Sequence, residues 1–207
     1  MCKFAGYYTA SKYQFPLETT LGNFLKYLFQ IILSPEKGWE DMAYDLNMNR
    51  INVRRLYIHS FLPLIAACSV TAFVRLVFGA DWLLCMASAI GEFVSLFLTY
   101  HLGIYIISWF MPRLVDPEAR DSQDQRRLAV VVMMSASFIA LVALVTNIIK
   151  VQIGLLAFLP FYVVFILWKG CGFLEIDRRQ EGLFMIVAST SVLGAYYLLS
   201  VIFNALL

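Results

Sequence analysis

The sequence predicts an all-α integral membrane protein, a bundle of five transmembrane spans preceded by an N-terminal cytoplasmic amphipathic helical arm. The 207-residue chain is 61% hydrophobic and only 14% charged, and its mean hydropathy is +0.74. A soluble domain is nearer half apolar and a quarter charged. The apolar residues come in blocks of about twenty, the length of a membrane-spanning helix, and not in the short alternating segments of a β-barrel. We therefore divide the chain into an arm, residues 1–55, and a membrane domain, residues 56–207.

The first part of the arm is predicted to contain one amphipathic helix. Residues 1–16 show no clear period, and we expect an irregular segment there. Within residues 17–33, apolar side chains recur at three- and four-residue steps, the period of one helix face. The residues of this face are Leu21, Phe24, Leu25, Leu28, Phe29 and Ile32. The uncharged run after Lys26 is too short to cross a bilayer, so this helix either lies in the membrane interface or packs against the cytoplasmic ends of the spans.

A second helix of the arm is expected to begin at Ser34 and Pro35. Serine is a good N-cap, and proline is tolerated at the first helical position. The apolar face of this helix consists of Trp39, Met42, Ala43 and Leu46. A polar and basic collar, residues 47–55, then leads into the first span.

Five apolar runs follow the arm, and each is predicted to be a span. They lie at about residues 56–79, 82–111, 128–149, 151–168 and 183–207. The turn at 79–81 is very short, so the first two spans run antiparallel. Charged loops at 112–127 and 169–181 follow the second and the fourth span. A tight turn at 147–152, which contains Lys150, separates the third span from the fourth; a re-entrant pair is the alternative for these two.

The positions of the basic residues predict the orientation of the spans. Cytoplasmic loops of membrane proteins carry an excess of Lys and Arg. With the N-terminus inside, all but two of the 16 Lys and Arg residues lie in cytoplasmic segments. The two exceptions are Arg75 and Lys150. The sequence therefore predicts a cytoplasmic N-terminus and a C-terminus outside.

Two segments of the chain carry a resemblance to a known family. One is L-S-P-x-x-G-W at residues 33–39, in front of five closely spaced spans, and the other is YVVFILWKGCG at residues 162–172. Over about residues 20–207 the chain resembles the bacterial branch of the YIP family, the Rab-interacting multi-span membrane proteins. The resemblance implies a non-catalytic protein of the bacterial inner membrane, linked in the eukaryotic members to membrane trafficking and organisation. The Asp-Leu-Tyr-Gly-Pro motif of the eukaryotic branch is missing here, and binding of Rab-type GTPases is not expected.

Glu92 is the leading candidate for a functional residue. It is the only formal charge in the second predicted span, and it lies about ten residues, roughly 15 Å, from the start of that span. An acid near the bilayer midplane is costly and usually faces a partner or a cavity. The polar residues on the same helical stripe are Ser88, Ser95 and Thr99. Two roles stay open: a structural acid bonded to neighbouring spans, and a pocket or transport role.

Arg75 is the nearest cation to Glu92 in sequence. It lies in the adjoining antiparallel span, so an ion pair between the two is one expectation. Because Arg75 is close to the end of its helix, its side chain can instead extend outward to the interface.

The remaining sequence features argue against several classes of protein. The cysteines Cys2, Cys68, Cys85 and Cys171 form no CxxC or Cys/His cluster, and no metal site or cofactor is predicted. No nucleophile elbow, phosphate loop, HExxH or catalytic carboxylate pair is present, so no enzymatic activity is expected. The net charge of +2 does not indicate a nucleic-acid partner.

The leading function predicted from the sequence is membrane organisation or partner recruitment. The partners would be the lipid bilayer and proteins that bind the arm and the two cytoplasmic loops. The alternative is a small transporter or lipid-handling protein that uses a polar pocket around Glu92. A visible inverted repeat, typical of many secondary transporters, is lacking.

Overall fold

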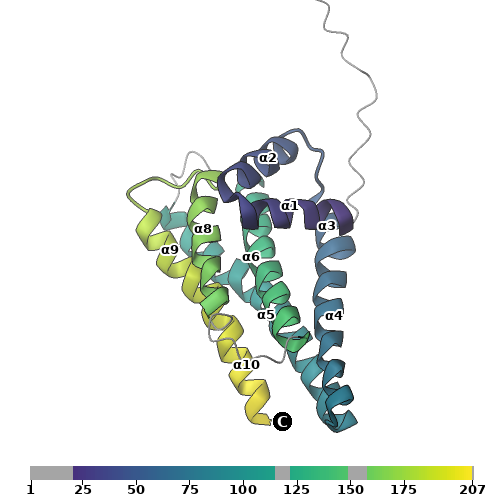
Figure 1. Cartoon of the computed structure of the whole chain (residues 1–207). Helices are drawn as coiled ribbons and strands as arrows, with labels where there is room; N and C mark the ends of the chain where they lie inside the picture. Colours follow the sequence, from purple (N-terminus) through teal and green to yellow (C-terminus); the bar gives the residue numbers. More distant parts are fainter. Residues whose placement is uncertain (1–20, 115–121, 149–157, 207) are drawn as a thin grey trace, which may run out of the picture.

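The computed structural model describes residues 21–114, 122–148 and 158–206, and every element in these ranges is helical. The prediction of an all-α fold is thus confirmed for this part of the chain. Two helices, α1 (Leu21–Leu33) and α2 (Pro35–Asn47), form the arm. Figure 1 shows α1 lying across one end of a bundle, whose helices run alongside one another away from the arm.

Four helices of the bundle are long and apolar enough to cross a membrane. They are Val53–Val77, Trp82–Met111, Gln125–Ile148 and Glu181–Phe203. These four helices indicate a multi-pass integral membrane protein. The third of them is the central helix, because 78% of its most apolar window is buried, against 22–39% in the other three.

The first and the last of these four helices each consist of several shorter helical elements. The first consists of α3 (Val53–Leu56), a π-helical turn η1 (Tyr57–Phe61), α4 (Leu62–Val70) and a 3-10 segment η2 (Thr71–Phe78). The π-helical turn ends two residues before Pro63, which has no N–H to donate to the preceding turn. The last consists of α9 (Glu181–Ser189), η5 (Thr190–Gly194) and α10 (Ala195–Leu206).

The two middle helices extend beyond the predicted spans. α5 (Trp82–Leu114) continues past residue 111, and α6 (Ser122–Ile148) begins before residue 128. The reason is that charged and polar residues end an apolar run without ending a helix, since Gln and Arg are good helix formers. Arg126 and Arg127 therefore lie in a helix and not in the predicted loop.

The predicted fourth span, 151–168, has only partial support. Residues 149–157 are outside the described ranges, and the described part is a short 3-10 turn, η4 (Leu159–Phe161), followed by α8 (Tyr162–Phe173). This apolar helix is too short to count with the four long ones. Contrary to the prediction, it continues past residue 168, so Lys169 lies within α8 and not in a loop. A fifth span stays a prediction.

A close approach of backbones joins the two helices of the arm. A Cβ atom at Gly38 in α2 would lie 2.8 Å from the backbone nitrogen of Ile31 in α1, a distance that only glycine permits. Pro35 takes the first position of α2 as expected, but the Ser34 side chain makes no capping hydrogen bond. The turn therefore depends on Pro35 and Gly38 more than on the predicted serine cap.

The arm packs on the bundle and also presents apolar side chains outward. Phe24, Leu28 and Ile31 of α1 are fully buried, and α1 contacts α6 and η1. Phe29 and Leu33 are 51% and 84% exposed. The predicted apolar face is therefore wrong in part: it included the exposed Phe29 and missed Ile31, because a helix crossing the bundle end buries only the side chains beneath it.

Hydrogen bonds fasten the arm to α8. The Trp39 indole N–H donates to the Ile166 carbonyl over 3.2 Å, and the Tyr162 hydroxyl donates to the Ile32 carbonyl over 2.8 Å. Within the arm, the Tyr27 hydroxyl donates to the Asp45 carboxylate. Burial, together with this bond, raises the pKa of Tyr27 above its ordinary value. Trp39, the last residue of the L-S-P-x-x-G-W segment, thus supplies one of the contacts that dock the arm.

Arg127 makes a second connection between arm and bundle. Its Nη1 lies 2.6 Å from Glu175 Oε1, in the segment between α8 and α9, and its Nη2 donates to Asn47 Oδ1 over 3.3 Å at the end of α2. The start of α6, the end of α2 and the segment before α9 therefore meet at the same end of the bundle.

Candidate functional site

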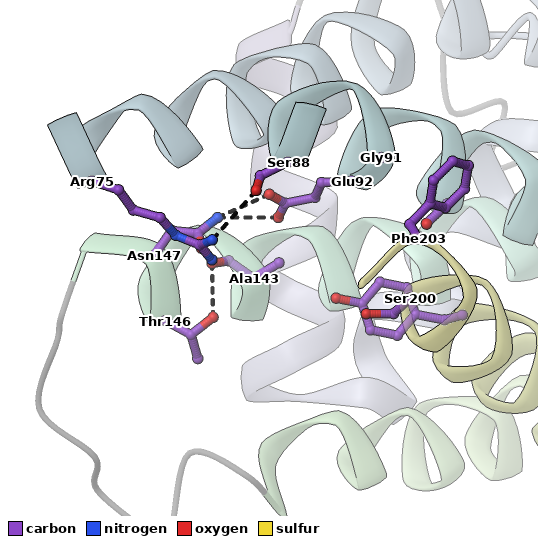
Figure 2. A pocket seen from close by; sticks show the side chains of 11 residues that line it. Arg75, Ser88, Gly91, Glu92, Ala143, Thr146, Asn147, Ser200 and Phe203 are labelled. Carbon is purple, nitrogen blue, oxygen red and sulfur yellow. Dashed lines mark hydrogen bonds between the residues drawn. The ribbon is translucent and has the colours of Figure 1, made fainter. Parts of the chain in front are cut away.

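A cavity of about 130 Å³ lies in the half of the bundle far from the arm. Its walls come from η2, α5, α6 and α10, as Figure 2 shows. The polar residues that line it are Arg75, Ser88, Glu92, Ser95, Thr146, Asn147, Tyr196 and Ser200. A site of this size has room for several water molecules. The structure therefore brings four of the five predicted site residues together: Arg75, Ser88, Glu92 and Ser95.

The periodicity of α5 explains why three of these residues share the cavity. Residues separated by three, four or seven positions lie on one face of a helix, so Ser88, Glu92 and Ser95 project in one direction. Thr99 continues this stripe but does not line the cavity. Its hydroxyl is buried with no hydrogen-bond partner among the described residues. Because Thr99 is not part of the cavity wall, its predicted inclusion in the site is not supported.

Asn147 holds the Glu92 carboxylate in place. Its Nδ2 atom donates to Glu92 Oε2 over 2.9 Å and to Oε1 over 3.2 Å. The same Nδ2 lies 3.2 Å from Thr71 Oγ1 in η2. Sequence reasoning assigned Asn147 only to a tight turn. The available signal was a polar pair, Thr146 and Asn147, ending an otherwise apolar run.

Arg75 reaches Glu92 only through other side chains. Its Nη2 donates to Asn147 Oδ1 and its Nη1 to Ser88 Oγ, both over 3.5 Å, which makes these bonds long and weak. The ion pairs within 4.0 Å between described residues do not include Arg75 with Glu92. The direct ion pair expected from the sequence is therefore absent, and the exposed Arg75 side chain lies at the edge of the cavity.

The Ser95 hydroxyl in the cavity wall is free to form a hydrogen bond, as far as the described residues show. The residue is only 2% exposed, and its hydroxyl has no hydrogen-bond partner in the part of the chain that the structure describes. Buried polar atoms are nearly always paired, and an unpaired one needs an explanation such as a water or a ligand. Ser95 therefore marks the point where the cavity can accept a polar group.

The last helix closes the cavity on one side. Gly91 lets Phe203 of α10 approach α5, because a Cβ atom at Gly91 would lie 3.3 Å from Phe203 Cβ. Tyr196 and Ser200, from the same helix, add hydroxyl groups to the wall. The small residues of this helix predicted only close packing, but the helix also contributes to the site.

The wall combines one carboxylate and one guanidinium with amide and hydroxyl groups. Such a lining can hydrogen-bond a small polar solute from several directions. Among residues 21–114, 122–148 and 158–206, no group of three or more His, Cys, Asp or Glu side chains is placed to hold a metal ion.

Comparisons with known proteins give no match for this chain. No family model matches it, and no match is found among curated proteins or solved structures. The resemblance to the YIP family stays a prediction that rests on residues 33–39, residues 162–172 and the order of the spans.

Proposed function

We propose that this chain is a non-enzymatic multi-pass membrane protein that binds a small polar solute in the cavity around Glu92, in the class of small transporters and lipid-handling proteins. One observation carries the proposal: the Glu92 carboxylate and the unpartnered Ser95 hydroxyl line the same cavity. A carboxylate inside a membrane span is costly, and such residues mark substrate or ion pathways.

The preferred solute carries N–H or O–H donors. An ionised carboxylate offers about four acceptor positions, and Asn147 fills one on each Glu92 oxygen. The remaining positions, with the Ser95 hydroxyl, suit an ammonium or amine group. Arg75, at the edge, disfavours a second positive charge, so the solute carries a single amine.

If the proposed site is correct, a cysteine that replaces Ser95 should react faster with cationic than with anionic reagents. In a background without the native cysteines, the Ser95→Cys thiol should react with a cationic thiosulfonate about tenfold faster than with an anionic one of similar size, because of the Glu92 charge. Adding Glu92→Gln should bring the two rates together. Methylammonium should slow the cationic reaction.

A matched control separates cavity access from general permeability. Ser135 in α6 is also fully buried, and its hydroxyl has no hydrogen-bond partner among the described residues, but it does not line the cavity. The Ser135→Cys thiol should stay unreactive. Equal labelling at both positions, or none at Ser95→Cys, would contradict the proposed solute site.

Membrane organisation or partner recruitment is the second candidate function. It is favoured by the exposed Phe29 and Leu33 side chains of a helix that lies across the bundle end. A helix of this kind can insert its apolar side chains into the membrane interface. The arm and the cavity lie at opposite ends of the bundle, so we expect variants at one site to leave the other site unchanged.

We further propose five spans, a cytoplasmic N-terminus, a C-terminus outside and a place in a bacterial inner membrane. The support is the Lys and Arg distribution, together with the contact of Arg127 near the start of α6 with Glu175, which follows α8. Because α6 runs away from that contact, the chain between Ile148 and Glu175 returns to the same end.

This orientation is tested by cysteine labelling from outside intact cells. We expect a membrane-impermeant reagent to label Asp81→Cys and to leave Ser122→Cys unlabelled until the membrane is permeabilised. The reverse pattern would refute the orientation, whatever the result at the cavity.

A further inference from the structure

A second cavity, of about 560 Å³, lies at the arm-side end of the bundle. It is lined by Asn49, Ile51, Asn52, Val53, Arg54 and Arg126. These residues come from the turn after α2, the start of α3 and the start of α6, so segments far apart in the sequence form the cavity together. Its volume is within the usual range of small-ligand pockets.

The charged residues that line this cavity within the described ranges are both arginines, Arg54 and Arg126. No carboxylate is among its described lining residues, and no ion pair within 4.0 Å is found for Arg54 or Arg126 in the described ranges. Neighbouring arginines differ: Arg50 pairs with Asp45 over 3.3 Å, and Arg127 pairs with Glu175 over 2.6 Å. Among the described residues, Arg50 and Arg127 are thus paired with acids, whereas the exposed Arg54 and Arg126 side chains are not.

The position of the two arginines relates the cavity to the membrane surface. Arg54 and Arg126 are each the second residue of a helix long enough to span, Val53–Val77 and Gln125–Ile148. Both arginines therefore lie at the ends of spanning helices, at the level of the lipid headgroups. Basic pockets between spanning helices at this level suit anionic lipid headgroups, and arginine binds phosphate oxygens with paired N–H groups.

We infer that this basic cavity binds the phosphate of an anionic lipid headgroup, with Arg54 and Arg126 on the phosphate oxygens. The Asn52 side-chain oxygen already accepts the backbone N–H groups of Arg54 and Arg55, over 3.1 and 3.3 Å. This fixes the backbone from which Arg54 extends. The site lies at the opposite end from Glu92 and does not depend on the solute proposed there.

The test compares lipid adducts of variants in native mass spectrometry. The protein is taken from nanodiscs of phosphatidylcholine with phosphatidylglycerol. We expect the full chain to retain phosphatidylglycerol selectively, and the double variant Arg54→Gln with Arg126→Gln to retain about tenfold less. The matched control is Arg178→Gln with Arg179→Gln, which removes two exposed arginines outside the cavity and should retain the lipid.

Two further measurements complete the test. A conservative variant, Arg54→Lys with Arg126→Lys, should restore part of the retention, and equal thermal midpoints in phosphatidylcholine alone show that the variants are folded. Equal loss in both glutamine doubles would overturn the site in favour of general surface charge. Displacement of the lipid by millimolar glycerol 3-phosphate would assign a soluble phosphate compound and overturn the lipid as the source.

Discussion

Replacement of Gly38 by leucine is expected to separate α1 from α2 and to lower the free energy of unfolding by about 1–3 kcal/mol. A Cβ atom at this position would lie 2.8 Å from the Ile31 nitrogen and 2.9 Å from its Cα. Backbone atoms cannot rotate away as a side chain can, so one helix has to move. The movement would also disturb Trp39, the next residue, whose indole N–H bonds to Ile166 of α8.

Limited trypsin digestion measures this effect directly. Cleavage at the exposed Lys26 in α1 should become faster in the Gly38→Leu protein, and the thermal midpoint should fall. Glu40→Leu, at an exposed position of the same helix, provides the control and should leave both values near those of the native chain. A Gly38→Leu protein with native protection at Lys26 would show that the close approach does not hold the arm.

Glu92→Leu is expected to destabilise the bundle more than Glu92→Gln, by about 1–3 kcal/mol. Leucine removes two of the three acceptors of the Asn147 amide, which now donates to Glu92 over 2.9 and 3.2 Å and to Thr71 Oγ1 over 3.2 Å. The loss of a hydrogen bond to a charged group lowers the free energy of unfolding. Glutamine keeps one oxygen that can accept from Asn147, so most of the stability should remain.

The difference is measured by unfolding in mixed micelles of mild detergent and sodium dodecyl sulfate, followed by tryptophan fluorescence. The pair Glu40→Leu and Glu40→Gln provides the reference for the same changes at an exposed site, and these two variants should not differ. If Glu92→Leu equals or exceeds the native stability, Asn147 does not depend on the carboxylate, and the structural part of the site is refuted.

The class of the protein and the position of its helices depend on local properties of the chain. Hydropathy blocks and the three- to four-residue period are present within each segment, and they predicted the four long apolar helices and the two helices of the arm. The stripe with Ser88, Glu92 and Ser95 is equally local, since one helix places these residues on one face. The sequence by itself therefore determined the membrane class and one wall of the cavity.

The partners across that wall were decided only by the tertiary structure. Which residues meet depends on how neighbouring helices are rotated and shifted, and the spacing along one helix does not contain this information. For that reason Asn147, and not Arg75, bonds directly to Glu92, and α10 contributes Tyr196 and Ser200. The docking of Trp39 on α8 and the basic cavity between Arg54 and Arg126 arise in the same way, because each joins segments that only packing brings together.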